Sequence, residues 1–450
     1  GFNSPRAPLH SSLVHRIFPP TMDITNDQAR ALFDAGCFIL LTGLPEGSEV
    51  GIDGRESKLT TQAERKGSYH AIRRFSGFKF VPPGLHLVTW SPAPSSSTGP
   101  AAIPIRHALI RILEQKERVV LTFDPQTETM RYDDQSVISD DHLRTLDGEL
   151  APYPFDGLDR WKELTRWIDR ETLQVLGEQR IVDGLTHVIG EETHKGEEVL
   201  SDMTAGIQFV QFKLRKSWKT GAVGEEVTRF SKDKSWLLGD VVNTQLNKIG
   251  ANPTLRLADT SDPFNLLGQL QLSFVLLLYL SLYGALSTYK RLLPLLTRSR
   301  SFLLHPEQYL GNLDMTVFLR AVISTLTAQL HAIPDGSFET ELPEFDMFLL
   351  DEIESLRHDI ASSPYRASLT TEWEELRRVG QRWHWDITGL SQTDVEEDEE
   401  SDEEGEYAPV VVDIECIVYN NQGMMAFLFF GYRSPNVSTY HRWPLIALGS

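Results

Sequence analysis

The stretch Gly77–Pro92, GFKFVPPGLHLVTWSP, decides the fold of the first part of the chain. On both sides of the Pro-Pro-Gly, apolar residues alternate with a period of two, which is typical of half-buried strands. Pro82 and Pro83 have no N–H to donate to a sheet, and Gly84 tolerates a tight corner. The pattern therefore predicts two strands joined by a corner.

His86 lies in the second of these strands and is the residue of this stretch that could carry chemistry. It is expected on the same face as Val88 and Trp90, because side chains alternate along a strand. No serine, cysteine or acid lies beside it in the sequence to make it a general base. We therefore expect a structural histidine; a hydrolase that uses His86 is an open alternative.

The residues around this corner predict a β-rich first domain. A short helical segment, TNDQARALFDAG, precedes the apolar strand CFILLTGL, and RVVLTFDPQTETMRYD has the pattern of a hairpin with its turn at 124–127. Short strands separated by turn residues are typical of a sandwich or a small barrel.

The pattern changes to a helical period from residue 152 onward. PYPFDGLDRWKELTRWIDRETLQVLG predicts one helix, and residues 184–235 an irregular connection with one strand, GIQFVQFKL. The next helix is expected to begin with Asp262 as its N-terminal cap. Pro263 follows at a position where its missing N–H does no harm. It is expected to run to Leu293, where Pro294 kinks or ends it.

The most apolar part of this helix, residues 270–286, is shorter than the roughly 20 residues of a membrane span. It also contains a glutamine, so we expect the central helix of a soluble core.

These patterns predict an α+β protein: a β-sandwich-like N-terminal domain, an all-α C-terminal domain, an acidic linker and a tail strand. The predicted segments are a disordered extension (1–21, whose composition also fits a transit peptide), a β-rich domain (22–160), a helix with an irregular connection (161–235), a helical domain (236–389), an acidic linker (390–407) and a tail with a docking strand (408–450).

The charge is distributed unevenly. The formal net charge is -20, and the segment 394–406, DVEEDEESDEEGE, carries half of that excess. The acidic balance argues against a protein that wraps nucleic acid. One loop, at 54–74, is basic and has aromatic residues, which fits either RNA contact or a solvated insertion. Two distant cysteines, Cys37 and Cys416, indicate a reducing compartment and no zinc site.

The acidic run is followed by YAPVVVDIE, a β-branched segment on a long, solvated linker. We expect a strand that adds to the sheet edge of a partner; docking on the protein's own first domain is the open alternative. The predicted strand comprises Val410, Val411, Val412, Asp413 and Ile414. Ser401, within EESDEE, is a candidate phosphorylation site.

The motifs of the common enzyme classes are missing from the sequence. It has no GxxxxGK[ST] loop, no GxGxxG after a strand, no HExxH and no GxSxG. We therefore expect a protein without catalytic activity, cofactor or metal.

Seven ordered stretches resemble the Aar-two splicing factor family, assembly chaperones of the U5 small nuclear ribonucleoprotein (U5 snRNP). They are LPEGSEVGID (44–53), FSGFKFVPPGLHLVTWS (75–91), PYPFDGLDRWKELTRWI (152–168), LLGQLQLSFVLLLYLSLYGALSTYKRLL (266–293), IPDGSF (333–338), RWHWDI (382–387) and APVVVDI (408–414). The resemblance implies a β-sandwich-like domain, a superhelical (VHS-like) helical domain and no enzymatic activity.

The resemblance also implies partners. Members of the family bind the RNase H-like and Jab/MPN-like domains of the central U5 scaffold protein and block premature helicase binding. They act with other U5 snRNP proteins, in the cytoplasm and the nucleus, and neither nucleic acid nor membrane is an expected partner. The sequence departs from the family pattern at 1–21, 54–74 and 416–450. A cytosolic trafficking adaptor that binds sorting peptides is the alternative function.

Overall fold

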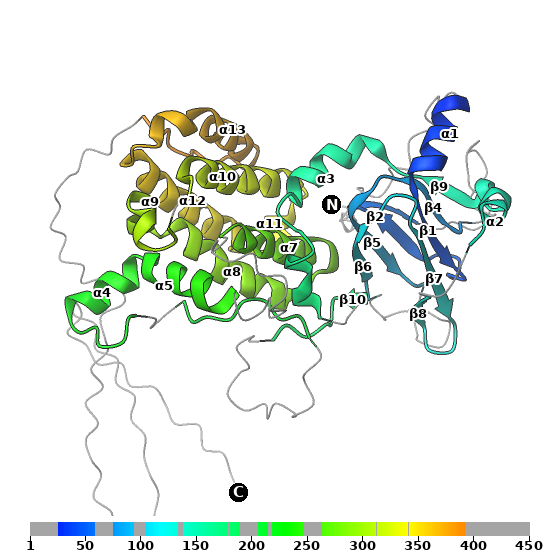
Figure 1. Cartoon of the computed structure of the whole chain (residues 1–450), viewed down its shortest axis with the longest axis horizontal. Coiled ribbons are helices and arrows are strands. Elements are labelled where there is room, and N and C mark those ends of the chain that lie inside the picture. Colours follow the sequence, from blue (N-terminus) through cyan, green and yellow to red (C-terminus); the bar gives the residue numbers. More distant parts are fainter. Residues whose placement is uncertain are drawn as a thin grey trace, which may run out of the picture. The chain divides into compact units, whose positions relative to one another are not determined.

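The structure is a computed structural model that describes residues 26–58, 75–93, 105–133, 138–177, 181–189, 206–214, 218–246, 263–311, 313–340 and 342–391. They belong to one compact unit. The fold is α+β, as predicted: an N-terminal part with two sheets precedes an all-helical part (Figure 1). No helix within the described ranges combines the length and hydrophobicity needed to cross a bilayer.

The N-terminal part consists of two five-stranded sheets within the described residues. Sheet A has the order β8-β7-β1-β4-β9 and sheet B the order β10-β6-β5-β2-β3. The β1–β7 and β4–β9 pairs are parallel and the other pairs antiparallel. The strands are β1 (Cys37–Thr42), β2 (Glu49–Ile52), β3 (Arg55–Lys58), β4 (Gly77–Val81), β5 (Gly84–Ser91), β6 (His107–Leu113), β7 (Arg118–Asp124), β8 (Thr129–Tyr132), β9 (Leu150–Pro152) and β10 (Ile181–Asp183).

The Pro-Pro-Gly corner carries the chain from sheet A to sheet B, because β4 belongs to one sheet and β5 to the other. The predicted hairpin also forms, from β7 and β8. Gly77, at the start of β4, has φ +136°, and a Cβ there would collide with the backbone of Ile39 on β1. Glycine at this position lets the two strands approach.

The inner faces of the two sheets form one core, to which Ile39 and Phe78 of sheet A and Val88 and Trp90 of sheet B contribute. The outer face of sheet A is covered by α1 (Asn26–Ala35) and α2 (Asp140–Thr145). A second, smaller hydrophobic core lies there, and Leu143 of α2 belongs to it. The alternation read from the sequence thus describes both faces of β5 correctly.

The outer face of sheet B belongs to the core of the helical part. Leu87, Ala108 and Ile110 from β5 and β6 lie in the same buried cluster as the helices. The two parts therefore share apolar packing.

The helical part begins with two short helices and continues with longer ones. Its helices are α4 (Glu225–Lys232), α5 (Ser235–Asp240), the π-helix η5 (Val241–Leu246), α7 (Phe264–Leu280), α8 (Tyr283–Thr297), α9 (Arg300–Leu304), α10 (Met315–Ala332), α11 (Ser337–Thr340), α12 (Phe345–Ala361) and α13 (Thr370–Gly380). Helix α10 begins with an N-cap residue, Asp314, whose side chain accepts a hydrogen bond from the N–H of Val317.

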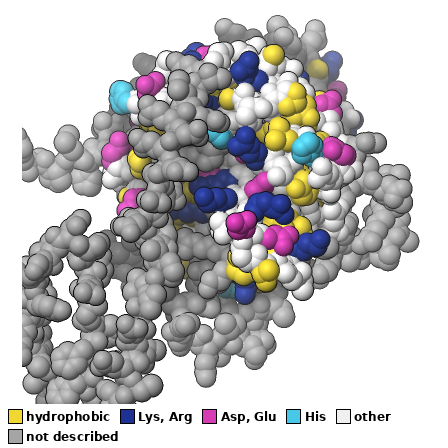
Figure 2. Space-filling view, turned by 90° about the vertical axis from the view of Figure 1, so that its left-hand side faces the viewer, with side chains coloured by type: hydrophobic (Ala, Val, Ile, Leu, Met, Phe, Trp, Pro, Cys, Tyr) yellow, Lys and Arg dark blue, Asp and Glu magenta, His cyan; other side chains and the backbone are white. Residues whose placement is uncertain are grey.

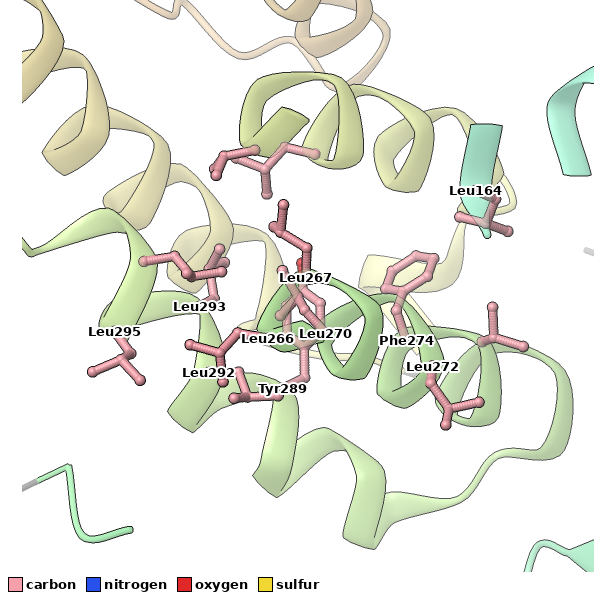
Figure 3. Close-up of a cluster of buried hydrophobic side chains, with 14 of the residues drawn as sticks. Leu164, Leu266, Leu267, Leu270, Leu272, Phe274, Tyr289, Leu292, Leu293 and Leu295 are labelled. Atoms are coloured by element: carbon pink, nitrogen blue, oxygen red, sulfur yellow. The ribbon is translucent and has the colours of Figure 1, made fainter. Parts of the chain in front are cut away.

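Helix α7 lies within the helical core, with side chains directed to several neighbours (Figure 3). It ends earlier than predicted: Ser281 adopts the left-handed conformation (φ 55°), and a separate helix, α8, follows. The expectation of one helix to Leu293 is therefore wrong. Pro294 lies inside α8, and Pro263 occupies the N-cap position of α7. Asp262, the expected cap, lies outside the described residues.

The long helix predicted over PYPFDGLDRWKELTRWIDRETLQVLG is also wrong in its second half. Helix α3 (Leu158–Leu164) ends after seven residues, and the 3-10 helix η4 (Thr172–Leu176) follows after a turn. The side-chain amide of Gln271 explains the break. It accepts from the N–H of Trp167 (2.7 Å) and donates to the carbonyl of Glu163 (3.3 Å). In a continuous helix those two backbone groups would bond to each other.

The strand predicted at GIQFVQFKL does not form; Ile207 makes a single bridge to Val188. The backbone N–H groups in this segment bond elsewhere. Gln208 donates to the carbonyl of Val175 (2.7 Å), and Val210 donates to the side chain of Gln269 (2.8 Å). Burial of this apolar segment against α7 replaces pairing with another strand.

Candidate functional site

The most polar buried group of the N-terminal part surrounds His86. Its ring is 2 % exposed. The Nδ1 atom lies 2.7 Å from the carboxylate of Asp53 and Nε2 lies 2.7 Å from the carbonyl oxygen of Pro82. Both ring nitrogens are therefore engaged by acceptors, and neither is left for a substrate.

Asp53 organises this group from the turn between β2 and β3. Its carboxylate also accepts from the hydroxyl of Tyr153 (2.6 Å) and from the N–H of Leu87 (2.9 Å). Burial and the neighbouring Asp53 raise the pKa of the Tyr153 phenol, which stays a donor. The cluster links the β2–β3 turn and β5 of sheet B to the residue that follows β9 of sheet A. This geometry supports the structural interpretation of His86 and removes the basis for the hydrolase alternative.

Asp53 escaped prediction because it lies 33 residues before His86 in the sequence. The local signal was GIDG, a turn with an acid at its centre, which indicates a turn and not a partner.

A second junction joins sheet B to helix α7. Gly54, next to Asp53, packs on Tyr279: a Cβ at Gly54 would lie 2.6 Å from the tyrosine hydroxyl oxygen. The guanidinium of Arg106 donates to the carbonyl of Tyr279 (3.0 Å). The indole N–H of Trp161, on α3, donates to the carbonyl of Leu85 on β5 (2.6 Å). These contacts fix the position of the sheet on the helices.

Three exposed apolar side chains lie on chain segments that meet near this junction. Ile105 is 42 %, Leu185 74 % and Tyr283 61 % exposed. Their segments meet, because the N–H of Gly184 donates to the carbonyl of Arg106 (3.2 Å), and a Cβ at Gly184 would lie 2.7 Å from the carbonyl oxygen of Leu280. We name Ile105, Leu185 and Tyr283 the junction patch. Exposed apolar groups that cluster are typical of protein-binding surfaces.

The described residues contain no group of three or more histidine, cysteine, aspartate or glutamate side chains that could hold a metal ion. Cys37 is buried, its thiol donates to the carbonyl of Glu114, and burial raises its pKa. A buried thiol with a raised pKa is a poor nucleophile.

The residues predicted to contact a partner lie outside the described part of the chain. This applies to Val410–Ile414 and to Ser401, so both remain predictions. Of the basic loop at 54–74, the structure describes residues 54–58. Arg55 pairs there with Asp156 (2.7 Å), an ion pair within the protein itself. The domain boundaries that we expect from the sequence also remain predictions.

Two family descriptions match this chain. The "AAR2 N-terminal domain" matches residues 35–177, and the "AAR2 C-terminal repeat region" matches residues 209–388. The first match covers most of the two-sheet part, and the second covers most of the helical part.

The mammalian relatives match over nearly their whole length, and a nematode relative matches over about a third. The chain is similar to the "Protein AAR2 homolog" of Mus musculus, with 25% identity over 425 residues, 88% of this chain and 98% of that protein. The protein of the same name from Homo sapiens is 25% identical over 418 residues, 86% of this chain and 96% of that protein. The one from Caenorhabditis elegans is 27% identical over 149 residues, 32% of this chain and 35% of that protein.

Proposed function

Because this chain belongs to the AAR2 family of splicing-related proteins, we propose that it is a non-enzymatic assembly chaperone of the U5 snRNP. The observation that carries the proposal is the pair of family matches, in order, from residue 35 to residue 388. The buried His86, with both ring nitrogens bonded, is consistent with a protein that works by binding.

In this function the chain binds the RNase H-like and Jab/MPN-like domains of the central U5 scaffold protein. Occupation of these domains in the cytoplasm prevents a helicase from binding before the particle matures, and the chaperone leaves in the nucleus. Other U5 snRNP proteins are present in the same particle. No substrate is converted, and no cofactor is needed.

The tail strand Val410–Ile414 supplies one contact by adding to a sheet edge of the scaffold. Main-chain hydrogen bonds provide affinity in this mode, and alternate side chains provide specificity. A phosphate on Ser401 would add roughly -1.5 to -2 charge to a linker that is already acidic.

The junction patch supplies a second contact in this proposal. It combines an aromatic side chain with two aliphatic ones, and buried aromatic anchors dominate the energetics of many interfaces. The rigid support beneath it, from Arg106 and α7, reduces the ordering cost of binding.

The test is a calorimetric titration of the scaffold's RNase H-like domain, alone and joined to the Jab/MPN-like domain, with the full chain. The informative variant is Val411→Pro, because proline cannot donate to a sheet ladder. Val418→Pro, outside the predicted strand, is the matched control. We expect Val411→Pro to weaken binding at least tenfold, or about 1.4 kcal/mol, and Val418→Pro to bind like the unaltered chain.

The outcomes separate the parts of the proposal. Equal binding by all three chains would keep the chaperone function and remove the tail strand from the interface. Absence of binding by the unaltered chain would contradict the chaperone function itself.

A further inference from the structure

A polar groove lies on the helical part, away from the junction patch. It is formed by one face of α12, the end of α4 and the turn that joins α8 to α9, and has a volume of about 660 Å³. On the side of the molecule that carries α4 and α9, Lys and Arg side chains gather with acidic ones beside them (Figure 2). The groove is large enough for several residues of an extended peptide.

Three exposed cations line one side of the groove: Lys232, Arg298 and Arg300. Arg298 is already held by the buried carboxylate of Glu352, at 2.6 Å. Lys232 and Arg300 form no ion pair within the described ranges, and Arg300 lies 3.5 Å from Nε2 of His358. Their charges are therefore available to an incoming anion.

Two of the four acidic side chains of the groove, Asp233 and Glu354, are occupied by contacts within the protein. The carboxylate of Asp233 accepts from the backbone N–H groups of Ser235 (2.9 Å) and Ser301 (3.0 Å). Glu354 accepts from Arg357 (2.7 Å) and from the N–H of Thr388 (3.2 Å). Donors that surround a carboxylate offset its charge, so these two acids repel an anion less than free acids would.

The floor of the groove contains Asp359, which is 8 % exposed. Its carboxyl group makes no hydrogen bond to the described part of the chain. Burial raises the pKa of Asp359 to about 7, with Arg300 opposing the shift and Asp233 adding to it. At neutral pH this group carries a proton in much of the population and can donate it to an oxygen.

We propose that this groove binds an acidic segment of a partner protein, whose carboxylate or phosphate oxygens lie between Lys232 and Arg300 and accept a hydrogen bond from Asp359. The remaining exposed acid, Asp351, lies on the α12 side of the groove. The proposal does not depend on the U5 function, because it follows from the charges and hydrogen bonds of the groove alone.

The test uses the full chain with residues 394–406 replaced by a Gly/Ser sequence in every variant, so that the probe is the sole acidic run in the titration. The probes are a hexaglutamate peptide and the same peptide with a central phosphoserine. We expect Lys232→Glu with Arg300→Glu to weaken binding of both probes at least tenfold. The matched control, Lys162→Glu with Lys219→Glu, changes the net charge equally at exposed sites outside the groove and should change binding less than threefold.

Circular dichroism melting checks that each variant is folded. If both double variants lost the same affinity for the probes, the effect would come from the net charge of the molecule and not from the groove. That result would overturn the proposal. No binding of either probe to the unaltered groove would also overturn it. Tighter binding of the phosphoserine probe would identify phosphate as the preferred anion, and equal binding would identify carboxylate as sufficient; both support the site.

A pH series with hexaglutamate tests the role of Asp359, since glutamate side chains stay ionised between pH 6 and pH 8. We expect binding to be tighter at pH 6, and Asp359→Asn, whose amide remains a donor, to remove this dependence. The charged and titratable groups that face Asp359 are Lys232, Asp233, Arg298, Arg300, Asp351, Glu354 and His358. His358→Gln is therefore the control and should keep the pH dependence. A dependence that survives Asp359→Asn would exclude Asp359 from the binding site.

Discussion

Arg106, which directly precedes β6 of sheet B, donates a 3.0 Å hydrogen bond to the carbonyl of Tyr279, in the last turn of α7. The carbonyl groups in the last turn of a helix lack partners within the helix. Here the guanidinium group of Arg106 is the hydrogen-bond donor for one of these carbonyl groups. Together with the packing of Gly54 on Tyr279, this bond holds the two parts of the chain together at this point.

Gly54→Ala should destabilise the protein by about 1–3 kcal/mol. The backbone at Gly54 has φ +77°, and a Cβ would lie 2.6 Å from the hydroxyl oxygen of Tyr279, on a ring that is packed in place. Gly148→Ala is the control, because a Cβ there meets nothing within 4 Å. Urea unfolding of both variants measures the difference; an equal effect of the two would contradict close packing of the β2–β3 turn on α7.

Gln271→Leu should cost about 1–3 kcal/mol for each backbone group that it leaves buried without a partner. The amide of Gln271 bonds to the N–H of Trp167 and the carbonyl of Glu163, and its side chain is fully buried. The exposed Gln174→Leu is the control and should stay within about 0.5 kcal/mol. Chemical denaturation measures the free energy of unfolding of both variants. A Gln271→Leu variant as stable as the parent would show that α3 can extend, with the N–H of Trp167 bonded to the carbonyl of Glu163.

Asp53→Ala should destabilise the protein by about 3 kcal/mol or more, because each buried donor that is left without an acceptor costs about 1–3 kcal/mol. Three donors lose their acceptor together: the His86 ring, the Tyr153 hydroxyl and the Leu87 N–H. Asp156→Ala is the comparison, since that acid is exposed and its pair with Arg55 should be worth at most about 1 kcal/mol. Thermal unfolding ranks the two, and a smaller loss for Asp53→Ala would refute the cluster as a support of the sandwich.

Leu185→Glu with Tyr283→Glu should leave stability unchanged within about 0.5 kcal/mol and weaken scaffold binding at least tenfold. Both side chains are more than half exposed, so their loss removes little internal packing. Val223→Glu, at 77 % exposure outside the patch, is the control for an added acid. Calorimetric titration of the scaffold domain measures the effect. Unchanged affinity in the double variant would exclude the junction patch from the interface.

Asp359→Asn should change how stability depends on pH. The pKa of Asp359 is raised from 3.8 to about 7 in the folded protein. Between these two pH values the folded state therefore binds more protons than the unfolded state. The stability that the protonated group contributes is fully present below pH 3.8 and is lost as the pH rises through about 7.

The parent should therefore lose up to about 4 kcal/mol relative to Asp359→Asn between pH 4 and pH 8. Urea midpoints across this range test it. A constant difference between the two proteins would mean that Asp359 does not titrate in that interval.

The sequence predicts the strands well where one face of a strand is buried between the sheets. Ile39, Phe78 and Val88 follow a period of two, and the hairpin of β7 and β8 has its turn at the expected place. These features depend on neighbours within a few residues, which the sequence displays directly.

Two of the three errors occur where a polar side chain from a distant segment takes over a backbone hydrogen bond; the third, at Ser281, is a left-handed residue that ends α7 early. Gln271 does this at α3, and Gln269 does it at Val210. In both cases the local pattern is sound, and a residue at least 59 positions away decides the outcome. The partners of His86 and the groove around Asp359 were beyond prediction for the same reason, since the tertiary fold brings their residues together.

The core that sheet B shares with the helices has a consequence for fragments of this protein. Leu87, Ala108 and Ile110 cover apolar surface that the helical part cannot cover alone. A truncated chain that begins after the sheets would present that surface to water and attract quality-control factors, as partly folded chains do. Early termination, a cut between the parts or the loss of an exon should therefore remove the whole protein from the cell, and no half-active product should accumulate.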